Sequence, residues 1–236
     1  MTHNAHGNWR RWLTFVMLLL VMPATIYLCH RAGGRVYYLA SVLIILYTMI
    51  PFFLVFEHRK PQAKELVVLA VLCAIAVASR AAFRMIDHFK PMTAIVMIAG
   101  VAFGPEAGFL VGAVSGFASN FLFGHGPWTP WQMFAMGLLG LTAGVLYRKG
   151  VLRRGRLSLS VFGALVTLFL YGGVMNPASV LMYQPNPTWP MIWTAFLTGL
   201  PVDLVHAAAT ALFLWFLAQP MLEKLDRVKV KYGLLE

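Results

Sequence analysis

A run of 41 residues, Ala107 to Tyr147, contains no Asp, Glu, Lys or Arg. A helix crosses a bilayer core with about 20 mainly apolar residues, so this run alone is long enough for two crossings. Across the chain, 60% of the residues are hydrophobic and only 11% are charged, whereas soluble domains contain about 25% charged residues. A chain so poor in charge cannot cover a surface that faces water, so we expect an all-α integral membrane protein with lipid as its solvent.

The apolar runs predict about eight membrane segments. The first follows Arg10 and Arg11 and is expected to kink at Pro23. The third carries Arg80 and Arg84 near its end, and the fourth is short and bounded by prolines. The expected segments are 12–29, 36–56, 64–84, 91–103, 106–123, 130–147, 157–173 and 190–218.

The basic residues predict the orientation of these segments. The net charge is +11, but the basic residues form short clusters between apolar runs and not one soluble basic face, which argues against nucleic-acid binding. With both termini in the cytoplasm, 14 of the 19 Lys and Arg residues fall inside, most densely in "YRKGVLRRGR", 147–156. Cytoplasmic loops of membrane proteins are enriched in Lys and Arg, which supports this topology.

Three connections on the outer side are then candidates for lining or capping a cavity. One is "RAAFRMIDHFK", 80–90, and another is the long uncharged stretch 172–190, which we expect to be a loop. The third is "FLFGHGPWTPWQMF", 121–134, where Gly-Pro and Thr-Pro steps favour a rigid turn. Its tryptophans Trp128 and Trp131 could stack on a ligand or serve as interfacial belt residues.

Small residues recur every fourth position in several segments, which places them on one helix face. Gly100, Gly104, Gly108, Gly112 and Gly116 form one such series, and Gly140 and Gly144 another; we expect them to let helices within this chain pack closely. Ala70, Ala74, Ala78 and Ala82 form a third series. This alanine stripe serves either internal packing or the docking of a partner helix.

Polar residues in apolar segments are costly and are usually functional. Asp203 and His206, three residues apart on one helix face, could bind substrate, relay a proton or form a structural pair. Asn120 and Gln132 could join helices or contact a ligand. The two cysteines form no CxxC pattern, so we expect no metal site and no cofactor.

The stretch "KPMTAIVMIAGVAFGPEAGFLVGAVSGFASNFLFGHGPWTPWQMFAMGLLGLTAGVLYRKG", 90–150, resembles the substrate-binding S components of energy-coupling-factor (ECF) vitamin transporters. The resemblance covers about 64–236, and the alanine stripe resembles the face by which S components dock on a coupling protein. "LPVDLVHA", 200–207, and "PMLEKLDRVKVKYG", 220–233, look most like the cobalamin and corrinoid branch. The family core has six helices, so the resemblance implies a six-helix core in 63–236 preceded by an extra hairpin and cytoplasmic linker in 1–62.

The resemblance implies a function and its partners. An S component in a bacterial cell membrane captures a vitamin from outside, then topples on a transmembrane coupling protein that two cytoplasmic ATPase subunits drive. The chain contains no GxxxxGK[ST] phosphate loop, so another chain must hydrolyse the ATP. By this resemblance the substrate contacts are Arg84, Asp87, His88, Asn120, His125, Trp128, Trp131, Gln132, Asn176, Tyr183, Trp189, Asp203 and His206.

Two other functions remain open from the residues. A solitary proton-coupled secondary transporter could use Asp203 as its proton carrier, although no inverted repeat is visible. An intramembrane enzyme could use Asp203 and His206, but no GxSxG or HExxH motif accompanies them. We therefore expect that the protein is not an enzyme.

Overall fold

The computed structural model describes residues 42–43, 45–47, 49–50, 53–54, 57 and 62–234, and the described part is helical. The expected hairpin segments 12–29 and 36–56 lie largely outside these residues. The remaining chain forms α4 (Ala63–Ala82), α5 (Met92–Phe103), α6 (Pro105–Phe123), α7 (Trp128–Arg148), α8 (Arg156–Val166), the π-helix η2 (Thr167–Tyr171), α9 (Gly172–Tyr183) and α10 (Trp189–Tyr232).

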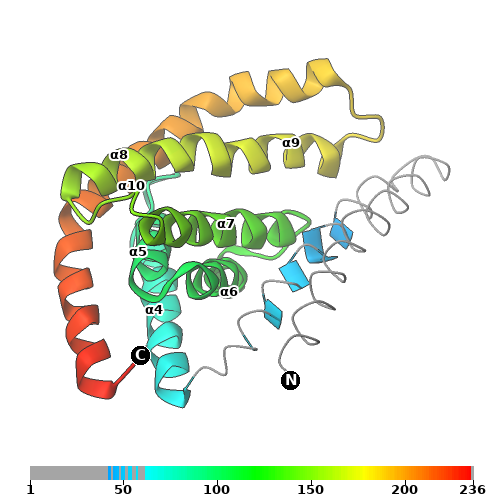
Figure 1. Cartoon of the computed structure of the whole chain (residues 1–236). Helices are drawn as coiled ribbons and strands as arrows, with labels where there is room; N and C mark the ends of the chain where they lie inside the picture. The colour runs from blue at the N-terminus through cyan, green and yellow to red at the C-terminus, as the bar shows by residue number, and fades with distance from the viewer. Residues whose placement is uncertain are drawn as a thin grey trace, which may run out of the picture.

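These helices confirm an all-α integral membrane architecture. Four stretches of the described chain are long and apolar enough to cross a membrane: Ala63–Ala82, Pro105–Phe123, Arg156–Tyr183 and Trp189–Tyr232. The third of these joins α8, η2 and α9 into one continuous 28-residue span. With α5 and α7, residues 62–234 contain six consecutive helical segments, four of which are long and apolar enough to cross a membrane (Figure 1).

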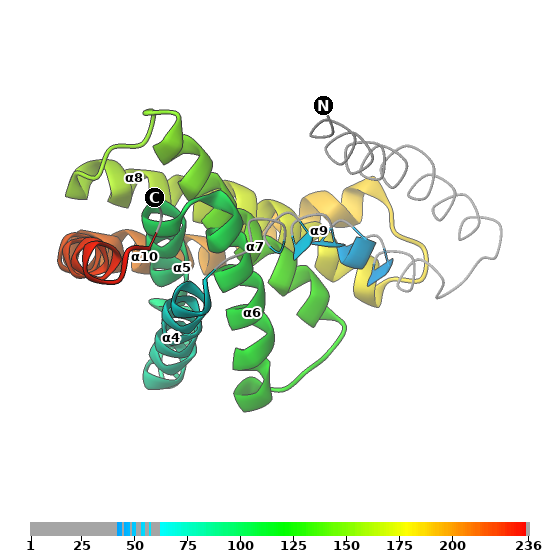
Figure 2. The ribbon, with the colours of Figure 1, turned by 60° about the horizontal axis from the view of Figure 1, so that its bottom comes forward.

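The short helix α5 lies at the centre of the bundle. All 12 of its residues are buried, and it packs against α4, α6, α7 and α10 (Figure 2). A helix that is apolar all round is expected to be enclosed by other helices. Gly104, with a φ of 94°, ends α5, and Pro105 begins α6, so the chain reverses direction within one residue.

Glycines bring α5, α6 and α7 into backbone contact, as the glycine series predict. The pair α6 and α7 forms the most extensive helix interface. A Cβ atom on Gly108 would lie 2.5 Å from the carbonyl oxygen of Gly140, and one on Gly144 would lie 2.5 Å from the backbone nitrogen of Pro105. Because only glycine leaves room for this approach, the three helices form a rigid unit against which the others pack.

The prediction of an outer loop over 172–190 is wrong for most of this stretch. The chain stays helical as α9 up to Tyr183, and α10 starts at Trp189, so only 184–188 connect them. The Gly-Gly and Asn-Pro steps suggest a break, but Pro177 is accommodated inside α9. Neighbouring helices and local π-helical adjustment allow proline inside membrane helices. Figure 1 shows α9 and the first part of α10 as a hairpin.

Helix α10 is also longer than the expected segment 190–218, because it continues to Tyr232. Its last turns are held at the end of the molecule opposite the α9–α10 loop. Arg154 forms an ion pair with Asp226 at 2.5 Å, and this ion pair raises the pKa of the guanidinium. Lys229 donates to the carbonyl oxygen of Ala102 at the end of α5. These contacts fix the basic tail against α5 and the loop before α8.

Candidate functional site

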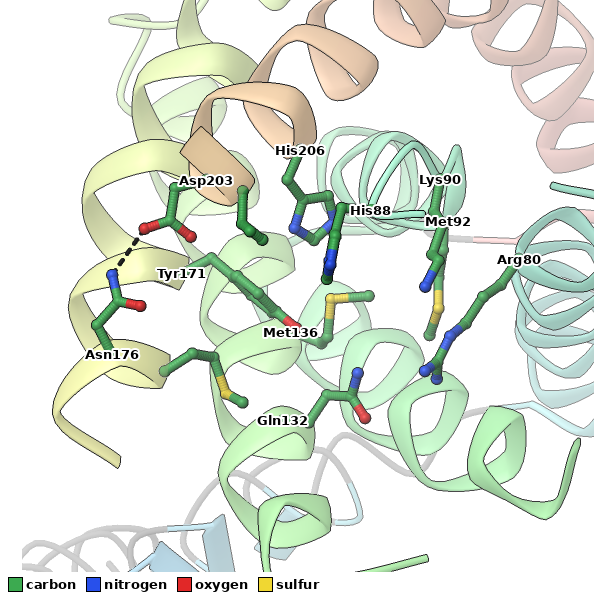
Figure 3. Close-up of a pocket in the computed structure, with 12 residues that line it drawn as sticks. Arg80, His88, Lys90, Met92, Gln132, Met136, Tyr171, Asn176, Asp203 and His206 are labelled. Carbon is green, nitrogen blue, oxygen red and sulfur yellow. Dashed lines mark hydrogen bonds between the residues drawn. The ribbon is translucent and has the colours of Figure 1, made fainter. Parts of the chain in front are cut away.

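A cavity of about 270 Å³ lies where α4, α5, α7, η2, α9 and α10 meet (Figure 3). This volume is close to the lower end of the usual range for small-molecule sites, about 300 to 1,000 Å³. Polar and apolar side chains share the wall. The lining residues are Arg80, His88, Lys90, Met92, Gln132, Met136, Tyr171, Met175, Asn176, Val202, Asp203 and His206.

Departures from regular helix shape one wall of this cavity. The π-helix η2 ends at Tyr171, directly before α9, and π-helical turns inside α-helices occur often at functional sites. A Cβ atom on Gly172 would lie 2.6 Å from a carboxylate oxygen of Asp203, and one on Gly199 would lie 2.5 Å from the amide oxygen of Asn176. The two glycines therefore leave the space that these two polar side chains occupy.

Asp203 and Asn176 form the polar centre of this wall. The Asn176 amide Nδ2 donates to the Asp203 carboxylate at 2.7 Å, and Asp203 is only 8% exposed. A carboxylate has four acceptor sites, and the described residues supply this one side-chain hydrogen bond to it. In Figure 3 the pair lies on the opposite side of the cavity from Arg80 and Lys90. The remaining acceptor sites are available to a ligand.

A second group of polar side chains connects α4, α6 and α7 behind one wall of the cavity. Arg80 donates through Nη1 to the Asn120 side-chain oxygen at 2.9 Å and to the Ser119 hydroxyl. The Asn120 amide donates in turn to the Gln132 side-chain oxygen at 2.9 Å. Asn120 is buried, so its hydrogen bonds hold Arg80 and Gln132 in place on the cavity wall.

The loop after α4 carries His88 and Lys90 into the cavity. Phe83 and Phe89 pack on Phe213 of α10, with ring centroids 5.1 and 5.4 Å away. His88 has a φ of 61°, which few residues other than glycine adopt without support from the surrounding structure. The aromatic contacts supply that support, because they attach the loop to α10.

Apolar and aromatic side chains form the cavity wall between the two polar sides. The Tyr171 ring packs edge-on against His206, with centroids 4.9 Å apart, and Met92, Met136 and Met175 complete this part of the wall. One turn beyond His206, the Thr210 hydroxyl lies 2.6 Å from that of Thr93. Methionine adapts to irregular shapes and makes favourable contacts with aromatic rings, so this middle section suits a flat ring.

The cavity brings together five of the thirteen expected contact residues, namely His88, Gln132, Asn176, Asp203 and His206. Asn120 supports this set from behind. Tyr183 lines a separate open groove between α9 and α10, Trp189 is 77% exposed, and Arg84 and Asp87 are exposed in the loop after α4.

The tryptophan turn does not line this cavity. His125 packs against Phe121, with centroids 4.7 Å apart, on the exposed end of α6. Trp131 packs in a separate cluster with Phe109, Ile45 and Met49, and the Trp128 ring covers Gly126. A role of His125, Trp128 and Trp131 in ligand contact stays a prediction, and in this structure they support α6 and α7.

Sequence reasoning missed Arg80, Lys90 and Tyr171 as lining residues. Arg80 carried a usable signal, because a charged side chain four residues before an expected segment end lies at membrane depth. Lys90 looks like an ordinary outer-loop charge. Tyr171, Met92, Met136, Met175 and Val202 look like ordinary apolar residues, and nothing in their spacing distinguishes them from core.

The four alanines of the alanine stripe all lie on the exposed face of α4. The opposite face buries Leu69, Leu72, Cys73 and Ala76. Internal packing therefore does not account for the stripe within the described part of the chain, and the stripe remains open to a partner helix.

Within residues 62–234 and the few described before them, no three His, Cys, Asp or Glu side chains come close enough together to hold a metal ion. His88, His206 and Asp203 share the cavity but do not form such a group. The arrangement is that of a binding pocket, with two polar sides and an apolar middle.

Comparison with known proteins agrees with this reading. A family described as "ECF-type riboflavin transporter, S component" matches residues 60–222. A "UPF0397 protein" from Vibrio atlanticus (strain LGP32) is 33% identical over 92 residues, which are 38% of this chain and 50% of that protein. The chain thus matches about half the length of that curated relative. No solved structure matches. The family match covers more than half of the chain, from before α4 into α10, and the chain belongs to the ECF-type riboflavin transporter S component family.

Proposed function

We propose that the protein is the substrate-binding membrane subunit of an ECF-type importer and that it holds a vitamin with a compact flat ring in the cavity around Tyr171. The observation that carries this proposal is the cavity itself. Its two polar sides are separated by a section of the wall that methionines and Tyr171 form. Small-molecule sites combine an apolar lining with a few placed polar groups in this way. The isoalloxazine ring of riboflavin has this shape.

The size of the cavity favours a small vitamin over a large one. A corrinoid with its nucleotide loop is several times larger than riboflavin, and a cavity of about 270 Å³ would have to open widely to bury most of it. The resemblance of 200–207 and 220–233 to the cobalamin branch supports a corrinoid, but the first stretch lines this small cavity and the second does not line it. Riboflavin is therefore our first candidate and cobalamin the competing one.

The test is a direct binding measurement on the purified protein in an uncharged detergent. We expect the fluorescence of riboflavin to be quenched when it binds to the protein. Cobalamin should bind at least about tenfold more weakly than riboflavin, because cobalamin cannot be buried to the same extent. Isothermal titration with each vitamin gives both dissociation constants. If cobalamin binds more tightly than riboflavin, the corrinoid assignment replaces ours.

The same proposal includes an orientation. Gln132 and Met136 line the cavity from the first turns of α7, and the basic loop 149–155 follows its last turn. Because 21 helical residues span about 30 Å, the cavity and this loop lie near opposite membrane faces. With the basic loop and both termini in the cytoplasm, the cavity is near the outer face, where a vitamin arrives.

We further propose that the alanine stripe on α4 docks on a transmembrane coupling protein, which lets the subunit topple and release its vitamin inward while two separate ATPases supply the energy. Alanines exposed at every fourth position form a flat surface that another helix can approach closely in lipid. The family is one of transporter subunits, which favours this mechanism over an enzyme using Asp203 and His206.

Replacing Ala74 with tryptophan is expected to reduce co-purification with the coupling protein at least about tenfold, because a large side chain keeps the two helices apart. Vitamin affinity should stay unchanged, since Ala74 is exposed and does not line the cavity. Ala208→Trp, on an exposed position of α10, is the matched control. Equal loss of co-purification in both variants would rule out docking through the stripe. Uptake that persists without any coupling ATPase would favour a solitary transporter.

A further inference from the structure

One side of the cavity carries two cations that face the same aromatic ring. The Arg80 guanidinium carbon lies 4.3 Å from the centre of the Phe123 ring, and the Lys90 ammonium nitrogen lies 5.6 Å from it. Both side chains also line the cavity, and Figure 3 shows them next to each other on one side of it. Like charges this close repel, so the arrangement needs a compensating group.

No carboxylate in the described part of the chain forms an ion pair with either cation. The ion pairs found there join Arg148 to Glu106, and Arg154 and Lys229 to Asp226. Arg80 uses Nη1 for Asn120 and Ser119, which leaves Nη2 and Nε of its guanidinium without a hydrogen bond to the described residues. Burial lowers the pKa of Lys90, Arg80 lowers it further, and Asp87 in the exposed loop opposes this.

The acidic group of the cavity is on the other side. Asp203 bonds to Asn176 there, and His88, His206 and Tyr171 lie between it and the two cations (Figure 3). The cavity is thus polarised, with acceptors at one end and cationic donors at the other. A neutral ligand would leave the cations uncompensated in a low-dielectric site, whereas an anion would form charge-assisted hydrogen bonds with them.

We propose that the transported molecule carries an anionic group, a phosphate or a carboxylate, which Arg80 and Lys90 bind, and a hydrogen-bond donor at its other end, which Asp203 accepts. This inference rests on the proposed function, because it places the vitamin in the same cavity. It adds the charge of the cargo and its direction in the site.

The first test compares flavins that share the isoalloxazine ring and carry a neutral or an anionic group on N10. Riboflavin and riboflavin 5′-phosphate share the ring, and 10-carboxymethylflavin offers a carboxylate instead. We expect at least one anionic flavin to bind the wild type about tenfold more tightly than riboflavin, and which one does so separates phosphate from carboxylate. Lys90→Gln should reduce this preference to about twofold or less. Lys149→Gln, in the exposed loop after α7, should keep it. Anionic flavins that bind no better than riboflavin to the wild type would overturn the inference.

The second test separates the anion site from the identity of the vitamin. The melting temperature of each variant is measured in inorganic phosphate and in sodium chloride at equal ionic strength, since a ligand that binds only the folded state stabilises it. We expect phosphate to raise the melting temperature of the wild type and Lys149→Gln but not that of Lys90→Gln. This result with no flavin binding would reject the flavin and retain the anion site. Equal stabilisation of all three proteins, or of none, would reject the anion site.

Discussion

Replacing Gly140 with alanine is expected to destabilise the folded protein strongly. A Cβ atom at this position would overlap the carbonyl group of Gly108 and lie 2.9 Å from its Cα atom. Overpacking a core usually costs about 1 to 3 kcal/mol, mostly through shifted side chains. Here the obstacle is backbone on the facing helix, which has no alternative rotamer, so we expect a cost at the upper end of this range. Thermal unfolding in detergent and the monodisperse fraction on gel filtration measure the effect.

Gly173→Ala is the matched control for this substitution. Gly173 is also helical, but a Cβ atom placed there meets no atom within 4 Å. Alanine has the higher helix propensity, so Gly173→Ala should leave the melting temperature unchanged or raise it. If Gly140→Ala is as stable as Gly173→Ala, then α6 and α7 do not pack as closely as described.

Replacing Asp203 with leucine is expected to weaken vitamin binding by about 10- to 100-fold. Two effects add in the same direction. The carboxylate offers acceptors to the ligand, and it also holds Asn176 in place at 2.7 Å. A lost hydrogen bond to a charged group costs about 1.5 to 3 kcal/mol, and each 1.4 kcal/mol is tenfold in affinity. Isothermal titration of riboflavin into each variant measures the loss.

Two further variants show what Asp203 contributes. Asp203→Asn keeps the shape and an acceptor oxygen, so it should bind more weakly than the wild type but more tightly than Asp203→Leu. Glu223→Leu removes an exposed carboxylate from a distant turn of the same helix and should bind like the wild type. Binding by Asp203→Leu with wild-type affinity would place the ligand elsewhere.

The sequence was sufficient to predict the position of most of the described helices. The expected segments 64–84, 91–103 and 106–123 match α4, α5 and α6 within two residues at each end, because charged loops and prolines mark the ends of apolar runs. Glycine spacing also predicted close internal packing. Helix α9 was missed because Gly172, Gly173 and Pro177 break helices in water, whereas membrane helices tolerate them.

The candidate site was less predictable, for a physical reason. Asp203, His206 and Asn176 could be selected because polar groups are rare in such segments. The residues that line the cavity with them come from η2, from α4 and from the loop after α4. Whether these residues lie close together depends on how the helices pack against one another. Tyr171 and Met136 are ordinary residues in sequence, and only the tertiary arrangement places them in one cavity wall with Arg80.

The π-helix η2 also determines how easily the cargo of such a protein can change. A π-turn holds one residue more than an α-turn, so losing a single residue between Thr167 and Tyr171 would convert η2 into regular α-helix and leave the helix after it close to its present orientation. Asn176 would then stay beside Asp203, while the wider turn that precedes α9 in the cavity wall would be lost. A deletion of one codon would thus change the shape of the cavity wall in a lineage without any substitution among the remaining wall residues.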